Sequence, residues 1–401
     1  MTLSRRHLLR CGAAGALGLA VRPSLALQDS PELARAVEQM EPYLTPQEKF
    51  RDVSRGKPVP HSLPPEKLAQ VGLTRETWKL EVLSDPENKA AIENPITLGW
   101  EGLMRLAEKR AVSYLKVMTC NNIGRPLGMG LWEGVPLRDV VWMTKPKENL
   151  RRVFYYGYHN DDPRQMFRSS LPIGRVLEDP PGLPPVLVCY KLNGEFLTPK
   201  RGGPVRILVP EAYGFKSVKW LTHVVLTNLA HANDTYADGN NDIDSPLKTF
   251  ARTSTVPKEI KAERPIPVTG IVQVGISGLS KVQVWVSRAG EATAADDPYF
   301  AKAPWKDADI LPLPAKWTDG LAGGKLQATP LGFDPNTARP ARWPMPLTKA
   351  HWATLLPGLP EGKYTLRCRS IDGNGIAQPM PRPFDKSGRA SIEATPLNVT
   401  A

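Results

Sequence analysis

Proline is spread along the whole chain and sets the strongest limit on its fold. There are 41 prolines among 401 residues. Each proline removes a backbone donor and fixes φ, so long helices and uninterrupted central strands are disfavoured. A chain of this length is large enough for two or three domains. We therefore expect short strands and short helices joined by many loops.

The charge of the chain is strongly basic, and it restricts the partners that the chain can have. Lys and Arg number 52 against 40 Asp and Glu, which gives a net charge of +12. The basic residues do not form one long run, and no nucleic-acid motif accompanies them. We therefore predict no nucleic-acid partner. A basic site for a small anion, such as an oxoanion or a phosphorylated cofactor, explains the charge equally well.

Residues 1–26 have the pattern of an export signal. Arg5 and Arg6 precede an apolar stretch rich in Ala, Gly and Leu, and the small residues Ser24 and Ala26 offer a cleavage site after Ala26. The run around Arg5-Arg6 resembles a twin-arginine signal, with an ordinary secretory signal as the alternative. We predict a periplasmic protein that folds before export. No later segment is apolar enough to span a membrane, so we expect no membrane span after cleavage.

The remaining chain divides into three parts, and together they predict an α+β fold. Residues 27–75 are polar and read as an N-terminal extension. Residues 76–245 mix strands with a helix near 100–109 and are predicted to form the catalytic domain. Residues 246–401 contain short alternating strands with Pro and Gly turns, which is typical of an Ig-like β-sandwich. Ala301–Ala328 is expected to be a long loop.

Within 76–245, two local patterns are the most informative. The apolar segment Val112–Met118 predicts a strand that ends directly before Cys120. Asn193-Gly194 lies between the apolar runs 186–190 and 195–197, and this dipeptide is the strongest short hairpin signal. Two further strands are expected, at 205–209 and at 218–226.

The cysteines do not predict a disulfide framework. Cys11 falls in the signal, which leaves Cys120, Cys189 and Cys368, an odd number. A free cysteine in an oxidising compartment needs a reason, such as burial or metal ligation. Cys120 ends a strand and is followed five residues later by Arg125, which favours a thiolate. Taken alone, this pattern fits a buried structural cysteine at least as well as a metal ligand.

Two sequence segments, which follow each other along the chain, favour the interpretation of Cys120 as a metal ligand. The first contains Cys120, Asn122 and Arg125, followed by Trp132-x-Gly134. The second runs from Asn193-Gly194 through Gly203-Pro204-Val205-Arg206 to Val218-Lys219-Trp220-Leu221. Together they resemble the cofactor-binding segments of the sulfite oxidase family. The resemblance is specific in residues 112–225 and only architectural in the sandwich.

The resemblance implies a molybdenum–molybdopterin cofactor and assigns residues to it. Cys120 is implied to bind molybdenum together with the two sulfurs of one pterin. Residues implied to hold the pterin and its phosphate are Asn122, Arg125, Arg206 and Lys219, with Arg201 at a place where the family often has His. Residues implied to face the substrate are Arg125 again, Arg55 just before Pro58-Val59-Pro60, and Arg389 near the C-terminus. Arg51 is the rival of Arg55.

The sequence departs from the family at the expected catalytic tyrosine. Counted from Lys219, that tyrosine should lie near Asn240 or Asn241, whereas Tyr236 comes several residues earlier. Either Tyr236 reaches the metal or an Asn replaces the phenol. We keep Tyr236 as the candidate catalytic residue.

The function implied by the resemblance is oxidation of a sulfur compound, either sulfite or protein-bound sulfane sulfur. The chain has no CxxCH haem motif, so a separate c-type cytochrome is expected to accept the electrons. The resemblance also allows a homodimer through the C-terminal domain. Two alternatives remain: a sulfoxide reductase on the same scaffold, and a cofactor-free periplasmic binding or scaffold protein.

Overall fold

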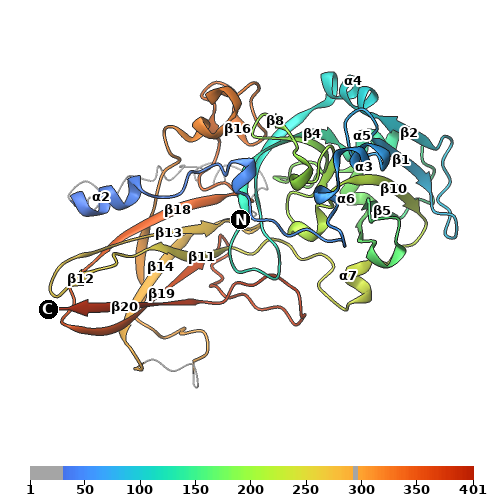
Figure 1. Ribbon diagram of the computed structural model, residues 1–401. Helices are drawn as coiled ribbons and strands as arrows, with labels where there is room; N and C mark the ends of the chain where they lie inside the picture. Colours follow the sequence, from blue (N-terminus) through green and yellow to red (C-terminus); the bar gives the residue numbers. More distant parts are fainter. Residues whose placement is uncertain (1–29, 292–296) are drawn as a thin grey trace, which may run out of the picture.

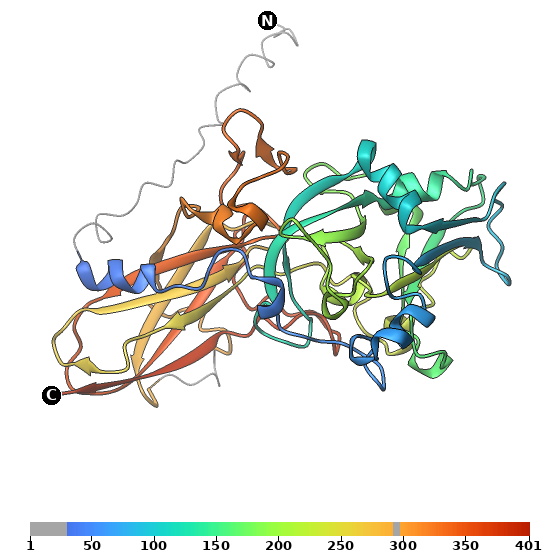
Figure 2. The same ribbon diagram turned by 45° about the horizontal axis from the view of Figure 1, so that its top comes forward.

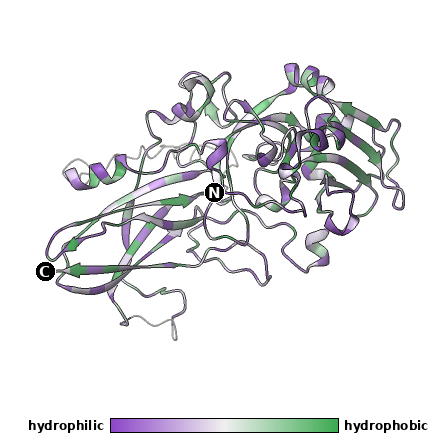
Figure 3. Cartoon of the chain, in the orientation of Figure 1, coloured by the Kyte–Doolittle hydropathy of each residue, from purple (hydrophilic) through white to green (hydrophobic). Residues whose placement is uncertain are grey.

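The computed structural model describes residues 30–291 and 297–401, arranged as two β-rich halves side by side (Figure 1). The signal predicted at residues 1–26 lies outside the described residues. Hydrophobic residues gather in the strands of both halves (Figure 3). The α+β class predicted from the sequence is confirmed. Within the described residues, none of the helices is both long and apolar enough to cross a membrane.

The first half contains two five-stranded sheets around a common core. One sheet has the order β2-β1-β10-β5-β6, in which β1 and β10 are parallel. Its strands are β1 (Lys79–Ser84), β2 (Ile96–Gly99), β5 (Arg152–Gly157), β6 (Arg168–Pro172) and β10 (Leu221–Thr227). The second sheet has the order β3-β4-β7-β8, with β9 paired to β7. Its strands are β3 (Val112–Met118), β4 (Gly128–Pro136), β7 (Leu187–Leu192), β8 (Glu195–Phe196) and β9 (Arg206–Leu208).

Short helices complete this half. They are α3 (Pro65–Gln70), α4 (Trp100–Arg110), α5 (Leu137–Trp142), α6 (Ile173–Leu177) and α7 (Thr235–Asp238). Fully buried residues of both sheets, among them Val82, Tyr155, Val188 and Ile207, share one core. Because the two sheets pack together, the loops at their ends are held in fixed relative positions.

The predicted hairpin is present between β7 and β8. Asn193 has φ 56° and Gly194 has φ 86°. Two successive residues with positive φ form the turn that matches the twist of a two-residue hairpin, and Asn-Gly adopts it readily. The predicted strand at 112–118 is also present, as β3. The strand expected at 218–226 begins only at Leu221, since Trp220 has φ 54° and interrupts the extended backbone.

The strands of the second half form one continuous eight-stranded sheet, whose two ends pack against each other as the two layers of a sandwich. β11 (Phe250–Thr255), β13 (Ile266–Gln273) and β18 (Lys349–Leu356) form one layer. The other layer contains β12 (Ile260–Lys261), β14 (Lys281–Arg288), β19 (Gly362–Ile371) and β20 (Glu393–Thr400). Val268 and Trp352 of the first layer share a core with Val284 and Leu366 of the second.

One prediction for this half was wrong. The segment 301–328 was expected to be a loop, but it contains β15 (Lys306–Ile310), which pairs with β18 of one layer and β14 of the other. Its sequence, Lys-Asp-Ala-Asp-Ile, has three charged residues among five, and none of the five residues is buried. The sequence gives little hydrophobic signal for such a strand. A small two-stranded unit, β16 (Phe333–Asp334) with β17 (Arg339–Pro340), lies outside the sandwich.

The N-terminal segment connects the two halves. Helix α2 (Pro31–Glu38) lies along the sandwich (Figures 1 and 2), where Leu33 packs with Leu311 and Ala353. The chain then crosses to the first half, where the Arg51 amide donates to the Leu127 carbonyl at 2.9 Å. Residues 50–56 thereby come to lie over the end of β3.

Candidate active site

A cavity of about 400 Å³ lies at the end of β3, under the N-terminal segment. Its walls come from residues 50–56, the loop after β3, residues 157–167, the segment 201–220 and Tyr236. One residue of the second half, Lys386, also reaches it. The cavity therefore forms where the ends of the sheets meet the segments that cross between the two halves.

The lining of this cavity is strongly cationic. Six Lys or Arg side chains line it, and no Asp or Glu is among the lining residues. They are Arg51, Arg55, Arg201, Arg206, Lys219 and Lys386. A concave site with one sign of charge concentrates ligands of the opposite sign. The cavity is therefore suited to anionic ligands.

Buried guanidinium groups at one end of the cavity have unused hydrogen-bond donors. Arg206 on β9 donates to the carbonyls of Arg201, at 2.9 Å, and Ser217. Its Nε is buried without a partner in the described part of the chain, as are Nε and Nη2 of Arg201. Burial lowers the pKa of Arg206 to about 10. Buried donors normally have acceptors, so both side chains fit an absent ligand that carries anionic or carbonyl oxygens.

Lys219 lies beside them with a full set of acceptors. Its Nζ donates to Asp52 Oδ1 and Ser54 Oγ, each at 2.8 Å, and to the Lys200 carbonyl at 2.9 Å. Burial, and then the charge of Arg206, lower the pKa of Lys219 to about 7. The three basic groups Arg201, Arg206 and Lys219, predicted to hold the pterin and its phosphate, therefore meet at one end of the cavity.

Cys120 lines the same cavity and differs from the other two described cysteines. It is partly exposed, whereas Cys189 and Cys368 are buried, and all three are free. Burial raises the pKa of Cys189 to about 12 and that of Cys368 to about 11, so neither is a ready thiolate. Among the described residues, no group of three His, Cys, Asp or Glu could hold a metal ion. A metal bound at Cys120 would need most of its ligands from the cofactor itself, which fits a pterin with two sulfurs.

Tyr236 lines the cavity, and the two asparagines considered as its substitutes do not. Its hydroxyl donates to Asn121 Oδ1 at 2.8 Å, and its ring stacks on Phe215 at 3.7 Å. Burial raises the pKa of Tyr236 to about 12, so the phenol stays a neutral donor near pH 7. Asn240 is exposed, and Asn241 donates to the backbone carbonyl of Tyr236.

The predicted substrate-facing arginines separate into two groups. Arg55 lines the cavity, with its guanidinium 4.8 Å from the Phe167 ring centroid, and its rival Arg51 lines it too. Arg125 is outside the lining and forms an ion pair with Glu393 at 2.9 Å. Arg389 is also outside the lining, and it is exposed. Asn122 lies in the lining as expected.

Sequence reasoning missed Lys386 and Asn121. Lys386 comes three residues before Arg389, and its backbone carbonyl accepts from the Asp242 amide at 3.2 Å. Asn121 is almost fully buried, and its Nδ2 has no partner in the part that the structure describes. The Asn-Asn pair after Cys120 was the only available signal for Asn121. Nothing in the sequence distinguishes Lys386 from other exposed lysines.

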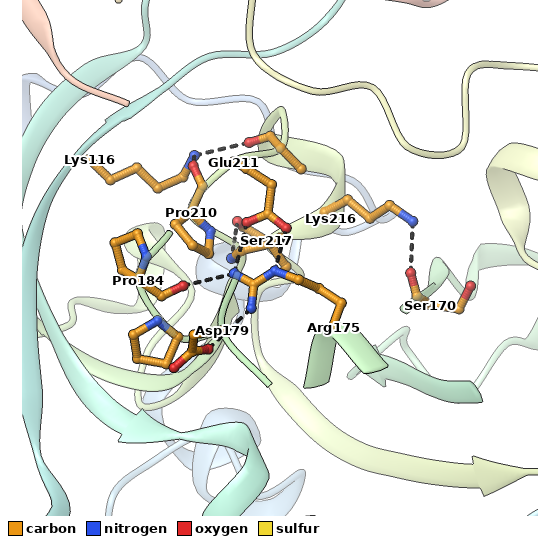
Figure 4. Close-up of polar contacts among 12 residues, drawn as sticks. Lys116, Ser170, Arg175, Asp179, Pro184, Pro210, Glu211, Lys216 and Ser217 are labelled. Atoms are coloured by element: carbon orange, nitrogen blue, oxygen red, sulfur yellow. Dashed lines mark hydrogen bonds and ion pairs between the residues drawn. The ribbon is translucent and has the colours of Figure 1, made fainter. Parts of the chain in front are cut away.

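A buried cationic network supports the segment 210–217 beneath the cavity (Figure 4). Lys116 Nζ donates to the carbonyls of Pro210 and Ala212 at 2.8 and 2.9 Å. Arg175 forms two bonds with the Glu211 carboxylate, at 2.7 and 3.0 Å. Lys216 Nζ donates to the Ser170 carbonyl at 2.7 Å. These contacts fix the backbone that presents Gly214, Phe215 and Ser217 to the cavity.

Lys116 makes the stability of the protein depend on pH. Burial lowers its pKa to about 7, whereas an unfolded Lys titrates near 10.4. Between these values the unfolded chain binds more protons, so the contribution of Lys116 to stability rises with pH. We expect Lys116→Met to be more destabilising at pH 9 than at pH 7, by on the order of 1–3 kcal/mol. Urea unfolding at both pH values measures this, and Lys109→Met on the exposed face of α4 is the control. An equal loss at both pH values would show that Lys116 is not titrating in this range.

Comparisons with known proteins agree with this site. A family model, the oxidoreductase molybdopterin binding domain, matches residues 67–235. A nitrate reductase (NADPH) from Beauveria bassiana is 29% identical over 185 residues, which are 45% of this chain and 20% of that protein. The mitochondrial sulfite oxidase of Drosophila melanogaster is 32% identical over 104 residues, 25% of this chain and 18% of that protein. The chain thus spans about a fifth of the length of these relatives.

The similarity in fold to a solved structure covers both halves of the molecule. The crystal structure of the sulfane dehydrogenase SoxCD from Paracoccus pantotrophus matches with a TM-score of 0.58 at 15% sequence identity. The match covers 94% of this chain and 92% of that chain. Most residues that line the cationic cavity, Cys120 among them, fall within the matched molybdopterin binding domain. The comparisons thus place a molybdopterin binding domain at residues 67–235 and relate the chain to a sulfite oxidase and to nitrate reductases.

Proposed function

We propose that this protein oxidises a small sulfur oxoanion or a protein-bound sulfane sulfur in the periplasm and passes the electrons to a c-type cytochrome. The observation that supports the proposal most directly is the cavity beside Cys120. Six basic side chains line this cavity, and no acidic side chain does. The likeness in fold to a sulfane dehydrogenase over nearly the whole chain supports the sulfur substrate. A homodimer through the C-terminal half is part of the same proposal.

The roles of the residues follow from their places in the cavity. When bound, the molybdenum cofactor supplies two-electron oxygen-atom transfer chemistry. Arg201 and Arg206 would hold its pterin and phosphate through their unused donors, Lys219 would join them by giving up one of its present acceptors, and Cys120 would bind the metal. Arg55 and Lys386 attract and orient the anion by charge. The Tyr236 hydroxyl, held neutral, can donate its hydrogen to an oxygen atom of the substrate in place of Asn121 Oδ1.

Metal content and electron transfer test the proposal together. The purified protein should contain about one molybdenum per chain and should reduce cytochrome c when sulfite or thiosulfate is added. Molybdenum without turnover of either compound would reject the sulfur substrate and retain the cofactor. Absence of molybdenum after expression in a host that makes molybdopterin would favour the cofactor-free binding protein.

Nitrate is a second candidate substrate because the relative from Beauveria bassiana is a nitrate reductase. Nitrate is also an oxoanion, so it fits the charge of the cavity. The two directions of catalysis separate the candidates: a reductase consumes electrons from a reduced dye when nitrate or a sulfoxide is added. An oxidase of sulfur compounds delivers electrons to cytochrome c instead.

The localisation part of the proposal is tested at the signal. If residues 1–26 form a twin-arginine signal, replacing Arg5-Arg6 by Lys-Lys should leave more than about nine-tenths of the protein in the cytoplasm. Cell fractionation followed by blotting measures the distribution. Replacing Arg10 by Lys, in the same leader, is the control and should not alter export. Normal export of the Lys-Lys variant would indicate the ordinary secretory route.

A further inference from the structure

The loop that carries Cys120 is held largely by the C-terminal sandwich. Residues 119–127 connect β3 to β4 in the first half. Yet Thr119 Oγ donates to Gln273 Oε1 on β13 at 2.5 Å. The Asn121 carbonyl accepts from the Arg389 amide at 3.1 Å. The residues on both sides of Cys120 are therefore anchored to the other half of the molecule.

The second part of the loop is held by two side chains of the sandwich. Arg252 on β11 donates through Nε to the Gly124 carbonyl at 2.7 Å and through Nη1 to the Ser391 carbonyl. Glu393, at the start of β20, pairs with Arg125 at 2.9 Å. Charge-assisted bonds of this kind are stronger than neutral ones.

Arg252 is central to this arrangement. Its side chain is only 4% exposed, and its guanidinium links the loop to the segment that leads into β20. Gly124 allows the close approach, because a Cβ there would lie 2.8 Å from Arg252 Nη2. The planar fork of the arginine reaches the two carbonyls from two separate nitrogens, Nε and Nη1, and the single nitrogen of a lysine does not reproduce that geometry. The position of residues 124–125, the second part of the loop, therefore depends on this guanidinium and on the Arg125–Glu393 pair.

We propose that Arg252 and Glu393 are positioning residues, through which the sandwich sets the place of the Cys120 sulfur. The pterin-holding groups Arg201 and Arg206 belong to the first half, whereas the loop of Cys120 is fixed from the second half. The distance between the Cys120 sulfur and these two guanidinium groups is thus set across the boundary of the two halves. This inference rests on the proposed role of Cys120 as the metal ligand. The C-terminal half thus helps to position an active-site residue, Cys120.

Hydrogen exchange on the purified full-length protein tests the structural step. In Arg252→Lys, amides within residues 117–127 should exchange about tenfold faster, as expected for the loss of one charge-assisted bond. The matched control is Arg367→Lys on β19, whose guanidinium lies over the Trp285 and Phe300 rings on the outer face of the sandwich. This control should leave the exchange of 117–127 unchanged. Equal exchange in the two variants overturns the proposal.

The metal spectrum and kinetics test the positioning step. Arg252→Lys and Glu393→Gln should retain molybdenum and pterin, change the absorption spectrum of the metal, and lower kcat per molybdenum about tenfold with KM within about twofold. A purely structural role predicts lower stability with an unchanged spectrum and unchanged kcat per molybdenum, and that outcome overturns the proposal. If Cys120→Ser leaves the metal spectrum unchanged, the premise fails. If the wild type oxidises no sulfur compound, the proposed substrate is wrong. The hydrogen exchange of residues 117–127 and the metal spectrum still test the positioning role of Arg252 and Glu393.

Discussion

Cys120→Ser should reduce turnover at least about a thousandfold, which corresponds to ~4 kcal/mol of activation free energy. Cys120 is the only partly exposed cysteine of the described chain and the only one in the cavity lining. A serine hydroxyl is a harder ligand and stays protonated near pH 7, so it cannot replace a thiolate at a soft metal site. We expect the pterin to remain, because Arg201, Arg206 and Lys219 do not depend on the thiol.

The measurement is kcat per chain, together with the molybdenum and pterin content. The matched control is Cys368→Ser, which makes the same change in the buried core of the sandwich. That variant should lose stability and keep its kcat, since Cys368 is not among the residues that line the cavity. A Cys120→Ser enzyme with full turnover would remove Cys120 from the metal site.

Local sequence patterns predicted the parts of the fold that depend on neighbouring residues. β3 was predicted with its observed bounds, because five of its seven residues are apolar or aromatic and a polar loop follows. The Asn193-Gly194 turn was predicted because its backbone conformation is set by those two residues themselves. The residues assigned to the cofactor were chosen by their order along the chain, and Cys120, Arg206 and Lys219 do line one cavity.

Features that depend on distant residues were not predicted. β4 contains Gly128, Gly130 and Gly134, a composition that argues against a strand. Its glycines are explained by packing: a Cβ at Gly128 would lie 2.5 Å from the Phe50 ring, and one at Gly130 would lie 2.3 Å from Leu192. Such contacts join segments that are far apart in the sequence. A local sequence pattern does not predict such contacts.

The same reason explains the differences at the site. Arg125 was assigned to the pterin or the substrate, whereas the structure pairs it with Glu393, 268 residues further along the chain. Arg389 was assigned to the anion, but Lys386 is the residue of that segment in the cavity lining. Spacing within a motif places a residue on the correct loop. The direction of its side chain depends on the partner that the other half supplies.

Arg55→Gln should raise KM for sulfite about tenfold to a hundredfold, with a smaller change in kcat. Arg55 lines the cavity and has no carboxylate partner in the lining, so its charge is free to attract an anion. Loss of one charged contact to an anion typically costs about 1.4–2.8 kcal/mol, and each 1.4 kcal/mol is tenfold in affinity. If Arg55 binds the ground state and the transition state alike, the loss appears in KM.

Salt dependence and two comparison variants make this prediction decisive. The KM of the wild type should rise with ionic strength, because charges beyond about 8–10 Å are screened at physiological salt, and Arg55→Gln should show a weaker rise. Arg389→Gln, an exposed arginine outside the lining, should match the wild type. A larger effect from Arg51→Gln would assign the anion to Arg51, which also lines the cavity. If all three variants, Arg55→Gln, Arg389→Gln and Arg51→Gln, have the KM of the wild type and salt does not alter it, the substrate is not a small anion. Protein-bound sulfur then becomes the favoured substrate.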